Sequence, residues 1–201
     1  MRLTVFGASG ATGKEIVRQA AADGNAVTAA VRNPGEVAFD DPNVQVAQCD
    51  VTVPEEVERA VDGSEAVLSA LGTRALNAQT HVYSQGSENI LHAMQNAGVR
   101  RFIGISAMPV GEPENVLERY VFFPLLYGFF GPAYDDMKRM EAIVEASDCE
   151  WTIFRPARLV DGGKTSKYQT SRADLAGAML ASIPDPAVMR HAVAILGSTH
   201  G

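Results

Sequence analysis

The sequence predicts an α/β fold in which a doubly wound, mainly parallel sheet forms a single domain. Short apolar runs rich in β-branched residues alternate with longer stretches of helical period, which is typical of βαβ units. Several of the runs are apolar on both faces, as a sheet covered by helices on each side requires. No Pro/Gly/Ser-rich linker, internal repeat or low-complexity tract divides the 201 residues, so one domain is expected over 1–201.

Seven strands and several helix ends can be placed along the chain. The strands are expected at residues 3–6, 26–31, 44–48, 66–70, 101–106, 151–155 and 192–196. Helices are expected to begin at three signals, namely Thr12, Thr52 or Val53, and Ser171, and two are expected to end at Gly24 and Gly98. The segment 109–132 is rich in proline, glycine and aromatic residues and has no clean period.

Composition restricts the partners. The formal net charge is −7 and no dense Lys/Arg run is present, which argues against nucleic acid and anionic membrane surfaces. The two cysteines, Cys49 and Cys149, have no CxxC spacing and no His-rich neighbours, so neither a disulfide framework nor a zinc site is expected. Small molecules or proteins are the expected partners.

Targeting signals are not expected. A strand pattern begins at Arg2, which leaves no room for a charged segment, an apolar segment and a cleavage site. The most apolar stretch, 121–130, has half of the roughly 20 residues that a membrane-spanning helix needs, and Pro124 and Gly128 interrupt it. A soluble, cytoplasmic protein is therefore expected.

A glycine-rich turn follows the first strand and opens a helix. Gly7, Gly10 and Gly13 have the spacing GxxGxxG, which departs from the common GxGxxG but occupies the position of a first βα turn. Glycines there permit a tight turn and close approach to a pyrophosphate, while the helix N-terminus supplies free N–H donors. A Rossmann-type dinucleotide site is therefore predicted, with these contacts in the turn: Gly7, Ser9, Gly10, Ala11, Thr12 and Gly13.

The ends of the next strands extend this site. Arg32 stands where NAD-specific proteins place an acid, and a guanidinium there can bind the 2′-phosphate of NADP(H), although an ordinary surface arginine is the alternative. Asp50 and Val51 are expected beside the adenine, with a helix-capping role as the alternative for Asp50. After the fourth strand the expected cofactor contacts are Leu71, Gly72, Thr73 and Arg74.

These motifs resemble those of the atypical short-chain dehydrogenase/reductases with an NmrA-like NAD(P)H-binding domain, and within them the biliverdin-IXβ reductase/flavin reductase branch. Further matching pieces are the segments 87–94, 98–99, 106–107 and 135–140. The resemblance implies an NADPH-dependent reductase of flavins, quinones or linear tetrapyrroles, with Ser106 beside the nicotinamide and Pro156 in the cofactor site. The chain departs from the branch at Arg158, where the animal enzyme has histidine, and in its longer, more aromatic 109–132 segment. The resemblance to this branch therefore does not identify the acceptor of this protein.

The family at large uses a Ser-Tyr-Lys set, and Ser106, Tyr134 and Lys138 supply those residue types. A tyrosine and a lysine four residues apart share one helix face, where the cation would lower the pKa of the phenol for proton donation. The alternative is that Tyr134 only anchors a helix start after Pro132. The aromatic run 120–130 is interpreted as a lid, a dimer surface or, more simply, core packing.

The predicted function is NADPH-dependent hydride transfer to a small conjugated acceptor, with acceptor contacts expected in about 107–134 and 156–171. The alternative is an NADP(H)-binding redox sensor of NmrA type that passes a signal to a protein partner without turnover. An epimerase is disfavoured because little chain follows Arg158 to form a nucleotide-sugar pocket. A monomer or homodimer is expected.

Overall fold

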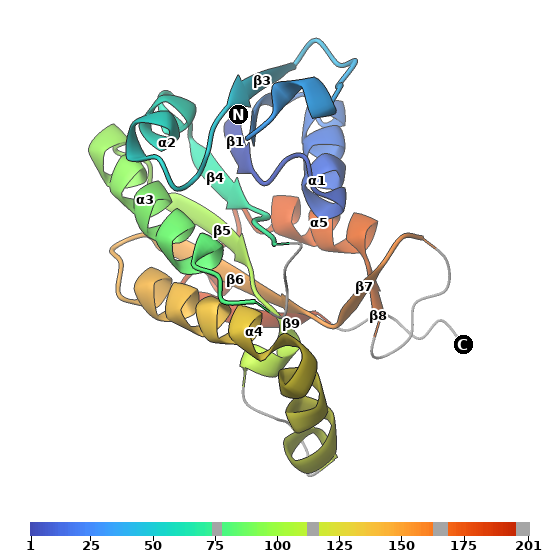
Figure 1. Cartoon of the computed structure of the whole chain (residues 1–201). Helices are drawn as coiled ribbons and strands as arrows, with labels where there is room; N and C mark the ends of the chain where they lie inside the picture. Colours follow the sequence, from blue (N-terminus) through green and yellow to red (C-terminus); the bar gives the residue numbers. More distant parts are fainter. Residues whose placement is uncertain (74–77, 112–116, 163–168, 196–201) are drawn as a thin grey trace.

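A single parallel sheet organises the computed structural model, which describes residues 1–73, 78–111, 117–162 and 169–195 (Figure 1). The strand order is β3-β2-β1-β4-β5-β6-β9. The bounds are β1 Arg2–Phe6, β2 Ala26–Val31, β3 Val44–Gln48, β4 Ala66–Ser69, β5 Arg101–Ile105, β6 Glu150–Pro156 and β9 His191–Ile195. The prediction of seven strands in a doubly wound sheet is confirmed, with each boundary within one residue of its expected position.

Helices cover both faces of this sheet. They are α1 Ala11–Ala22, α2 Pro54–Val61, α3 Val82–Ala97, α4 Phe123–Glu145 and α5 Arg172–Ala181. Figure 1 shows α1 and α5 on one face and α2, α3 and α4 on the other. Single turns lie at η1 Pro34–Glu36, η2 Met108–Val110, η3 Glu118–Phe122, which is a π-helical turn, and η4 Pro186–Val188.

The core has two halves, one on each face of the sheet. Val67 of β4 packs with the α2–α3–α4 side, and its neighbour Leu68 packs with the α1–α5 side. Both side chains are fully buried, because successive residues of a strand point to opposite faces and both faces are covered. This burial explains why the strands are continuous apolar runs in the sequence.

A buried arginine ties together the far half of the sheet. The guanidinium of Arg101, in β5, donates to the carbonyl oxygens of Ile183, Glu150 and Ser182 at 2.9, 2.6 and 2.6 Å. It also donates to Thr152 Oγ1 at 2.8 Å. Burial lowers the pKa of Arg101, and this set of acceptors stabilises the charge in place of water.

The strand order changes direction at β1, which pairs in parallel with β2 on one side and with β4 on the other. The first three strands run outward to one edge of the sheet, and β4 to β6 and then β9 run outward to the opposite edge. At such a switch point the loops after β1 and β4 diverge and leave a crevice outside the carboxyl ends of the strands. The glycine-rich turn lies at this point.

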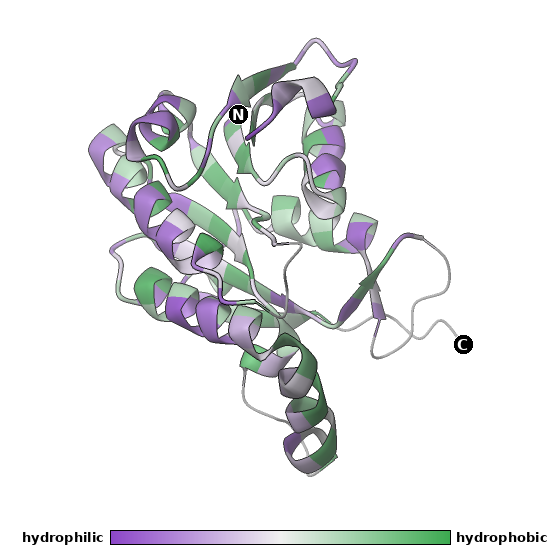
Figure 2. Cartoon of the chain, viewed as in Figure 1, coloured by the Kyte–Doolittle hydropathy of each residue, from purple (hydrophilic) through white to green (hydrophobic). Residues whose placement is uncertain are grey.

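The segment 109–132 departs from expectation. Tyr134 does not begin a helix after Pro132, because α4 already begins at Phe123 and Tyr134 lies about three turns inside it. Pro132 is tolerated within α4 although it removes one N–H donor, and the carbonyl left without it belongs to exposed Gly128. The first half of α4 projects from the body and is largely hydrophobic (Figure 2).

Two short strands, β7 Arg158–Val160 and β8 Gln169–Ser171, pair in a separate parallel ribbon that was not expected. The predicted start of a helix at Ser171 is confirmed, since the Ser171 hydroxyl accepts a hydrogen bond from the Asp174 N–H at 2.9 Å.

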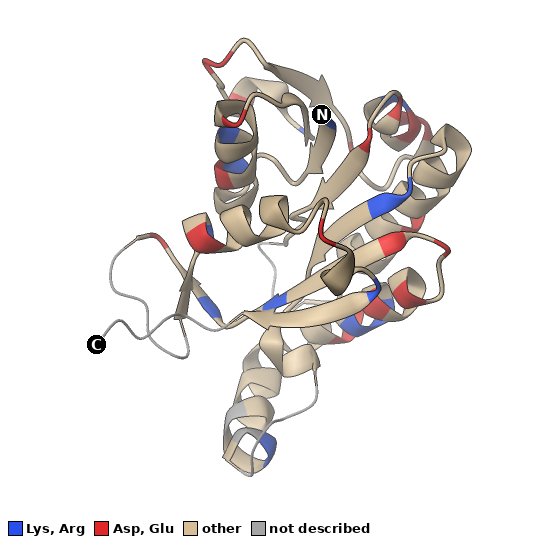
Figure 3. Cartoon of the chain, turned by 180° about the vertical axis from the view of Figure 1, so that it is seen from behind, with Lys and Arg blue, Asp and Glu red and all other residues tan. Residues whose placement is uncertain are grey.

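Within the described residues no helix is long and apolar enough to cross a membrane. Lys and Arg lie interspersed with Asp and Glu in the view of Figure 3.

Candidate cofactor site

The glycine-rich turn brings three backbone segments into contact. Gly7 has φ +72°, a left-handed conformation that favours glycine, and a Cβ there would lie 2.3 Å from the Ala70 carbonyl oxygen. A Cβ on Gly13 would lie 2.2 Å from the Gly7 carbonyl oxygen. The Gly10 N–H donates to that same oxygen at 3.0 Å and closes the turn. The GxxGxxG spacing therefore reflects close packing of β1, α1 and the end of β4.

The first turn of α1 faces this crevice with free donors. Gly10 is the N-cap and supplies no side-chain cap, and no acidic residue stands in the first turn. The N–H groups of Ala11, Thr12 and Gly13 precede the first donor of the helical ladder, which is Lys14 N–H to the Gly10 carbonyl at 2.9 Å. Free donors and the positive end of the helix dipole favour a phosphate at this point.

A groove of about 410 Å³ runs from this turn across the carboxyl ends of the strands. It is lined by most of the residues predicted to contact the cofactor: Gly7, Ser9, Gly10, Arg32, Asp50, Val51, Leu71, Gly72 and Thr73. Arg74, also predicted, lies outside the described residues. The arrangement fits an extended dinucleotide with its pyrophosphate over the glycine-rich turn.

One end of the groove carries charge. Arg32 follows β2, is exposed, and forms no ion pair with any residue in the described ranges. Asp50 Oδ1 accepts from the Thr52 N–H and hydroxyl at 2.9 and 2.8 Å, and these bonds hold its pKa below the usual range. Asp50 does not cap α2, whose N-cap is Val53, so the capping alternative was wrong. Sequence reasoning missed Glu36, which also lines this end.

The other end is bounded by the loop after β4, which α3 holds in place. The backbone of Thr73 donates a hydrogen bond to the phenol oxygen of Tyr83. A Cβ on Gly86 would lie 2.9 Å from Leu71 Cδ1 and from Val51 Cγ1, so only glycine lets α3 approach these residues this closely. Sequence reasoning missed Tyr83 and Gly86, although a glycine inside a helical pattern is a signal for close packing.

Ser106 and Pro156 lie at the same edge of the sheet, beyond the lining of the groove. Ser106 follows β5 and is 3% exposed, and its Oγ has no hydrogen-bond partner in the described part of the chain. Pro156 ends β6, where it pairs with Ile195 and is buried. A buried hydroxyl without a partner is costly in a folded protein, so Ser106 has the character of a group that binds a ligand.

The geometry of Tyr134 and Lys138 differs from the prediction. Burial raises the pKa of Tyr134 to about 12, with the nearby phenols of Tyr127 and Tyr83 adding to the effect. The ammonium of Lys138 lies 4.7 Å from the ring centroid of Tyr127 instead. The expectation that Lys138 lowers the pKa of Tyr134 was therefore wrong, because burial of the phenol dominates.

Tyr127 was not singled out from the sequence. Its ring packs edge-on against Tyr134 with 5.1 Å between the centroids. Its phenol oxygen is buried and has no hydrogen-bond partner within the described ranges. Together with Tyr83, these two residues form a cluster of three tyrosines near the loop after β4.

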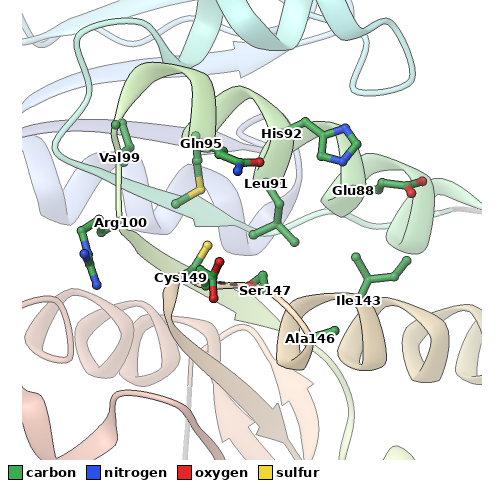
Figure 4. A pocket seen from close by; sticks show the side chains of 13 residues that line it. Glu88, Leu91, His92, Gln95, Val99, Arg100, Ile143, Ala146, Ser147 and Cys149 are labelled. Carbon is green, nitrogen blue, oxygen red and sulfur yellow. Dashed lines mark hydrogen bonds between the residues drawn. The ribbon is translucent and has the colours of Figure 1, made fainter.

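A larger cavity, about 700 Å³, lies elsewhere, between the C-terminal halves of α3 and α4 (Figure 4). Val99 and Cys149 mark its position at the amino ends of β5 and β6, the edge of the sheet opposite to the glycine-rich turn. Burial raises the pKa of the Cys149 thiol, which favours the unreactive neutral form. The larger volume of this cavity therefore does not make it the functional site.

Among the described residues no group of three or more His, Cys, Asp or Glu could hold a metal ion.

Comparison with known proteins agrees with the groove. Residues 7–198 match a family model described as NAD(P)H-binding. The chain belongs to this NAD(P)H-binding family. The family-level resemblance to NmrA-like, atypical short-chain dehydrogenase/reductases is thereby confirmed, and the cofactor class of the family is NAD(P)H. The assignment to the flavin reductase branch stays a prediction.

Two relatives match most of this chain. An uncharacterised chloroplastic protein of Arabidopsis thaliana is 31% identical over 169 residues, covering 79% of this chain and 59% of that protein. The photosystem II assembly factor Ycf39 of Synechocystis is 27% identical over 165 residues, covering 81% of this chain and 46% of that protein. The chain thus spans about half the length of these relatives, and their functions do not transfer directly.

Solved structures share the fold. The oxidoreductase ylbE from Lactococcus lactis matches with a TM-score of 0.84 at 19% identity, over 98% of this chain and 91% of that one. A short-chain dehydrogenase/reductase from Veillonella parvula, solved in complex with NADP, matches at 0.80 and 18% identity, over 99% and 95%. The anaerobillin reductase ChuY from Escherichia coli matches at 0.80 and 19%, over 100% and 99%. At these identities the likeness shows the fold alone.

Proposed function

We propose that the chain is an NADPH-dependent oxidoreductase that transfers hydride to a small conjugated acceptor such as a flavin, a quinone or a related carbonyl compound. The observation that carries the proposal is the groove itself, which extends from the glycine-rich turn to Arg32, an exposed arginine outside the ion pairs of the described ranges. Arg32 would bind the 2′-phosphate of NADPH by charge-assisted hydrogen bonds. Structures of NADP-bound and reductase proteins with the same fold support this function.

The proposed cofactor contacts follow the groove. Ala11, Thr12 and Gly13 would bind the pyrophosphate through their N–H groups, and Gly7 and Gly10 would let it approach the backbone. The adenine would lie beside Asp50 and Val51. The nicotinamide end would lie toward Ser106, in contact with the residues that remain from the prediction: Leu71, Gly72, Thr73, Arg74 and Pro156.

The acceptor would bind over the edge of the sheet where Ser106 is located. Bound NADPH supplies a hydride. The unpartnered Ser106 Oγ can donate a hydrogen bond to the acceptor oxygen that becomes negative as the hydride arrives. Tyr134, with a pKa of about 12, stays protonated at neutral pH and can act as a hydrogen-bond donor. Lys138 would act on this site only indirectly, through the ring of Tyr127.

The region proposed to surround the acceptor comprises 107–134 and 156–171. Within it the described structure has η2, η3, the first half of α4 and the β7–β8 ribbon. These elements adjoin β5 and β6, whose carboxyl ends carry Ser106 and Pro156. Arg158 is exposed at the start of β7 and would contact an anionic acceptor there.

The test is oxidation of NADPH, followed at the nicotinamide absorbance band, against a panel of flavins, quinones and dichlorophenolindophenol, with NADH in parallel. Ser106→Ala and Tyr134→Phe should each lower kcat, and Arg100→Ala, a change at an exposed side chain at the opposite edge of the sheet, is the control. Turnover that prefers NADPH and falls in the Ser106 variant supports the proposal. Tight NADPH binding without turnover on any acceptor would contradict it.

One observation favours the alternative of an NADP(H)-binding sensor without turnover. The projecting half of α4 exposes large apolar side chains, including Leu125 at 58% and Phe129 at 63%, and such surfaces often mark contacts with proteins. Relatives of this chain include a protein known as an assembly factor. Absence of turnover together with tight NADPH binding would favour this alternative.

A further inference from the structure

The amino end of α3 is capped from another helix. Its own N-cap residue, His81, makes no side-chain capping hydrogen bond, and the first turn of α3 contains no acid. Asp136 of α4 replaces that cap: its Oδ2 accepts the Tyr83 N–H at 3.0 Å, and its Oδ1 accepts the Ser84 hydroxyl. Asp136 is fully buried, so its carboxylate depends on these donors.

A cation completes this contact. Arg139, one turn further along α4, pairs with Asp136 Oδ1 at 3.2 Å and donates to the Thr80 carbonyl at 3.3 Å. The Thr80 hydroxyl in turn accepts the Val82 N–H at 3.3 Å. In these contacts the Asp136 carboxylate is faced by groups of α4 and of the first turn of α3, and Arg139 extends the contacts to Thr80 before α3. Together these bonds fix where α3 begins.

The same turn of α3 reaches the cofactor groove. Tyr83 is 4% exposed, and its phenol oxygen accepts a hydrogen bond from the Thr73 backbone, within the loop that bounds the nicotinamide end. One turn later, Gly86 lets α3 contact Leu71 and Val51. A continuous path therefore runs from Asp136 through the backbone and phenol of Tyr83 to the loop after β4.

We infer that Tyr83 and Asp136 are positioning residues for NADP(H), which hold the Leu71–Gly72–Thr73 loop in the conformation that receives the nicotinamide half. The inference rests on the proposed placement of the cofactor in this groove. Neither residue lines the groove. Loss of either restraint lowers the fraction of molecules with a binding-competent loop, and the apparent Kd rises in proportion.

The test compares NADPH with adenosine 2′,5′-bisphosphate, which has the adenosine end and lacks the nicotinamide half. Tyr83→Phe removes one hydrogen-bond acceptor and keeps the ring, so it should raise the Kd for NADPH by about three- to tenfold. The Kd for the bisphosphate should change by less than about twofold. Tyr120→Phe is the control, because that phenol is exposed. The amide of Thr73 should also exchange faster in Tyr83→Phe, because it loses the hydrogen bond to the phenol oxygen.

Asp136→Asn provides a second variant, with the exposed neighbour Asp135→Asn as its control. The same selective loss of NADPH affinity is expected for Asp136→Asn and not for Asp135→Asn. Should Asp136→Asn fail to fold, Tyr83→Phe decides alone. An unchanged NADPH Kd in Tyr83→Phe, or equal weakening of both nucleotides, would overturn the inference. Binding of neither nucleotide to the unaltered protein would overturn the proposed function and this inference with it.

Discussion

Replacement of Arg32 by alanine should remove the proposed preference for NADPH over NADH. Arg32 is exposed at the mouth of the groove, and within the described ranges no carboxylate pairs with it. Its guanidinium can therefore bind a 2′-phosphate, although the Asp50 carboxylate at the same end of the groove also interacts with this charge. Hydrogen bonds to a charged group contribute about 1.5 to 3 kcal/mol, and solvent screening at this exposed position reduces the upper end to about 2.5 kcal/mol. The Kd for NADPH should then rise about ten- to sixtyfold.

The assay is a titration with NADPH and with NADH, followed by nicotinamide fluorescence, in the unaltered protein and in Arg32→Ala. The Kd for NADH should change by less than about twofold, because NADH carries no phosphate for Arg32 to bind. Arg100→Ala is the matched control, since Arg100 is also exposed but lines the cavity at the opposite edge of the sheet. Equal weakening of both nucleotides, or an unchanged Kd for NADPH, would refute the placement of the 2′-phosphate at Arg32.

Three further predictions concern packing and charge. Gly13→Val should abolish NADPH binding and destabilise the fold, because its side chain would overlap the Gly7 carbonyl; a titration and a thermal melt test this, and unchanged binding would contradict it. Arg101→Met should lower the free energy of unfolding by about 3 to 5 kcal/mol, because it leaves buried carbonyl groups without a hydrogen-bond donor. Denaturant titration measures this loss, and a loss below about 1 kcal/mol would contradict the prediction. Burial raises the pKa of Cys49 from 9.0 to about 12 and that of Tyr134 from 10.0 to about 12. Both groups lose their proton at a lower pH in the unfolded chain than in the folded protein, so stability present below about pH 9 should be lost as the pH rises toward about 12. A midpoint of denaturant unfolding that stays constant from about pH 8 to about pH 11 would contradict this prediction.

The architecture could be predicted because each strand has both faces buried. Val67 and Leu68 show the principle, since each packs into a different half of the core and the run between turns must be apolar throughout. The glycine-rich turn was equally accessible, because a side chain at Gly13 would clash with the backbone of nearby Gly7, and the left-handed φ of Gly7 itself favours glycine. Local constraints of this kind leave a pattern in the sequence.

Contacts between distant segments leave no such pattern. The bond between Asp136 and the Tyr83 N–H joins residues 53 apart, and nothing in the spacing of either helix indicates it. The pKa of Tyr134 was predicted in the wrong direction because the spacing to Lys138 describes one helix, whereas burial depends on what packs against it. In the segment 109–132, Pro132 and the glycines suggest breaks, yet α4 runs continuously from Phe123 to Glu145.

The central claim, that NADP(H) binds in the groove at the carboxyl ends of the strands, is tested most directly by backbone NMR of the protein with and without NADPH. Bound NADPH should slow amide exchange and cause large shifts at Ala11, Thr12 and Gly13, with smaller shifts at Gly72 and Thr73. Shifts confined to the cavity between α3 and α4 in Figure 4, or NADPH binding that leaves the first turn of α1 unchanged, would contradict it.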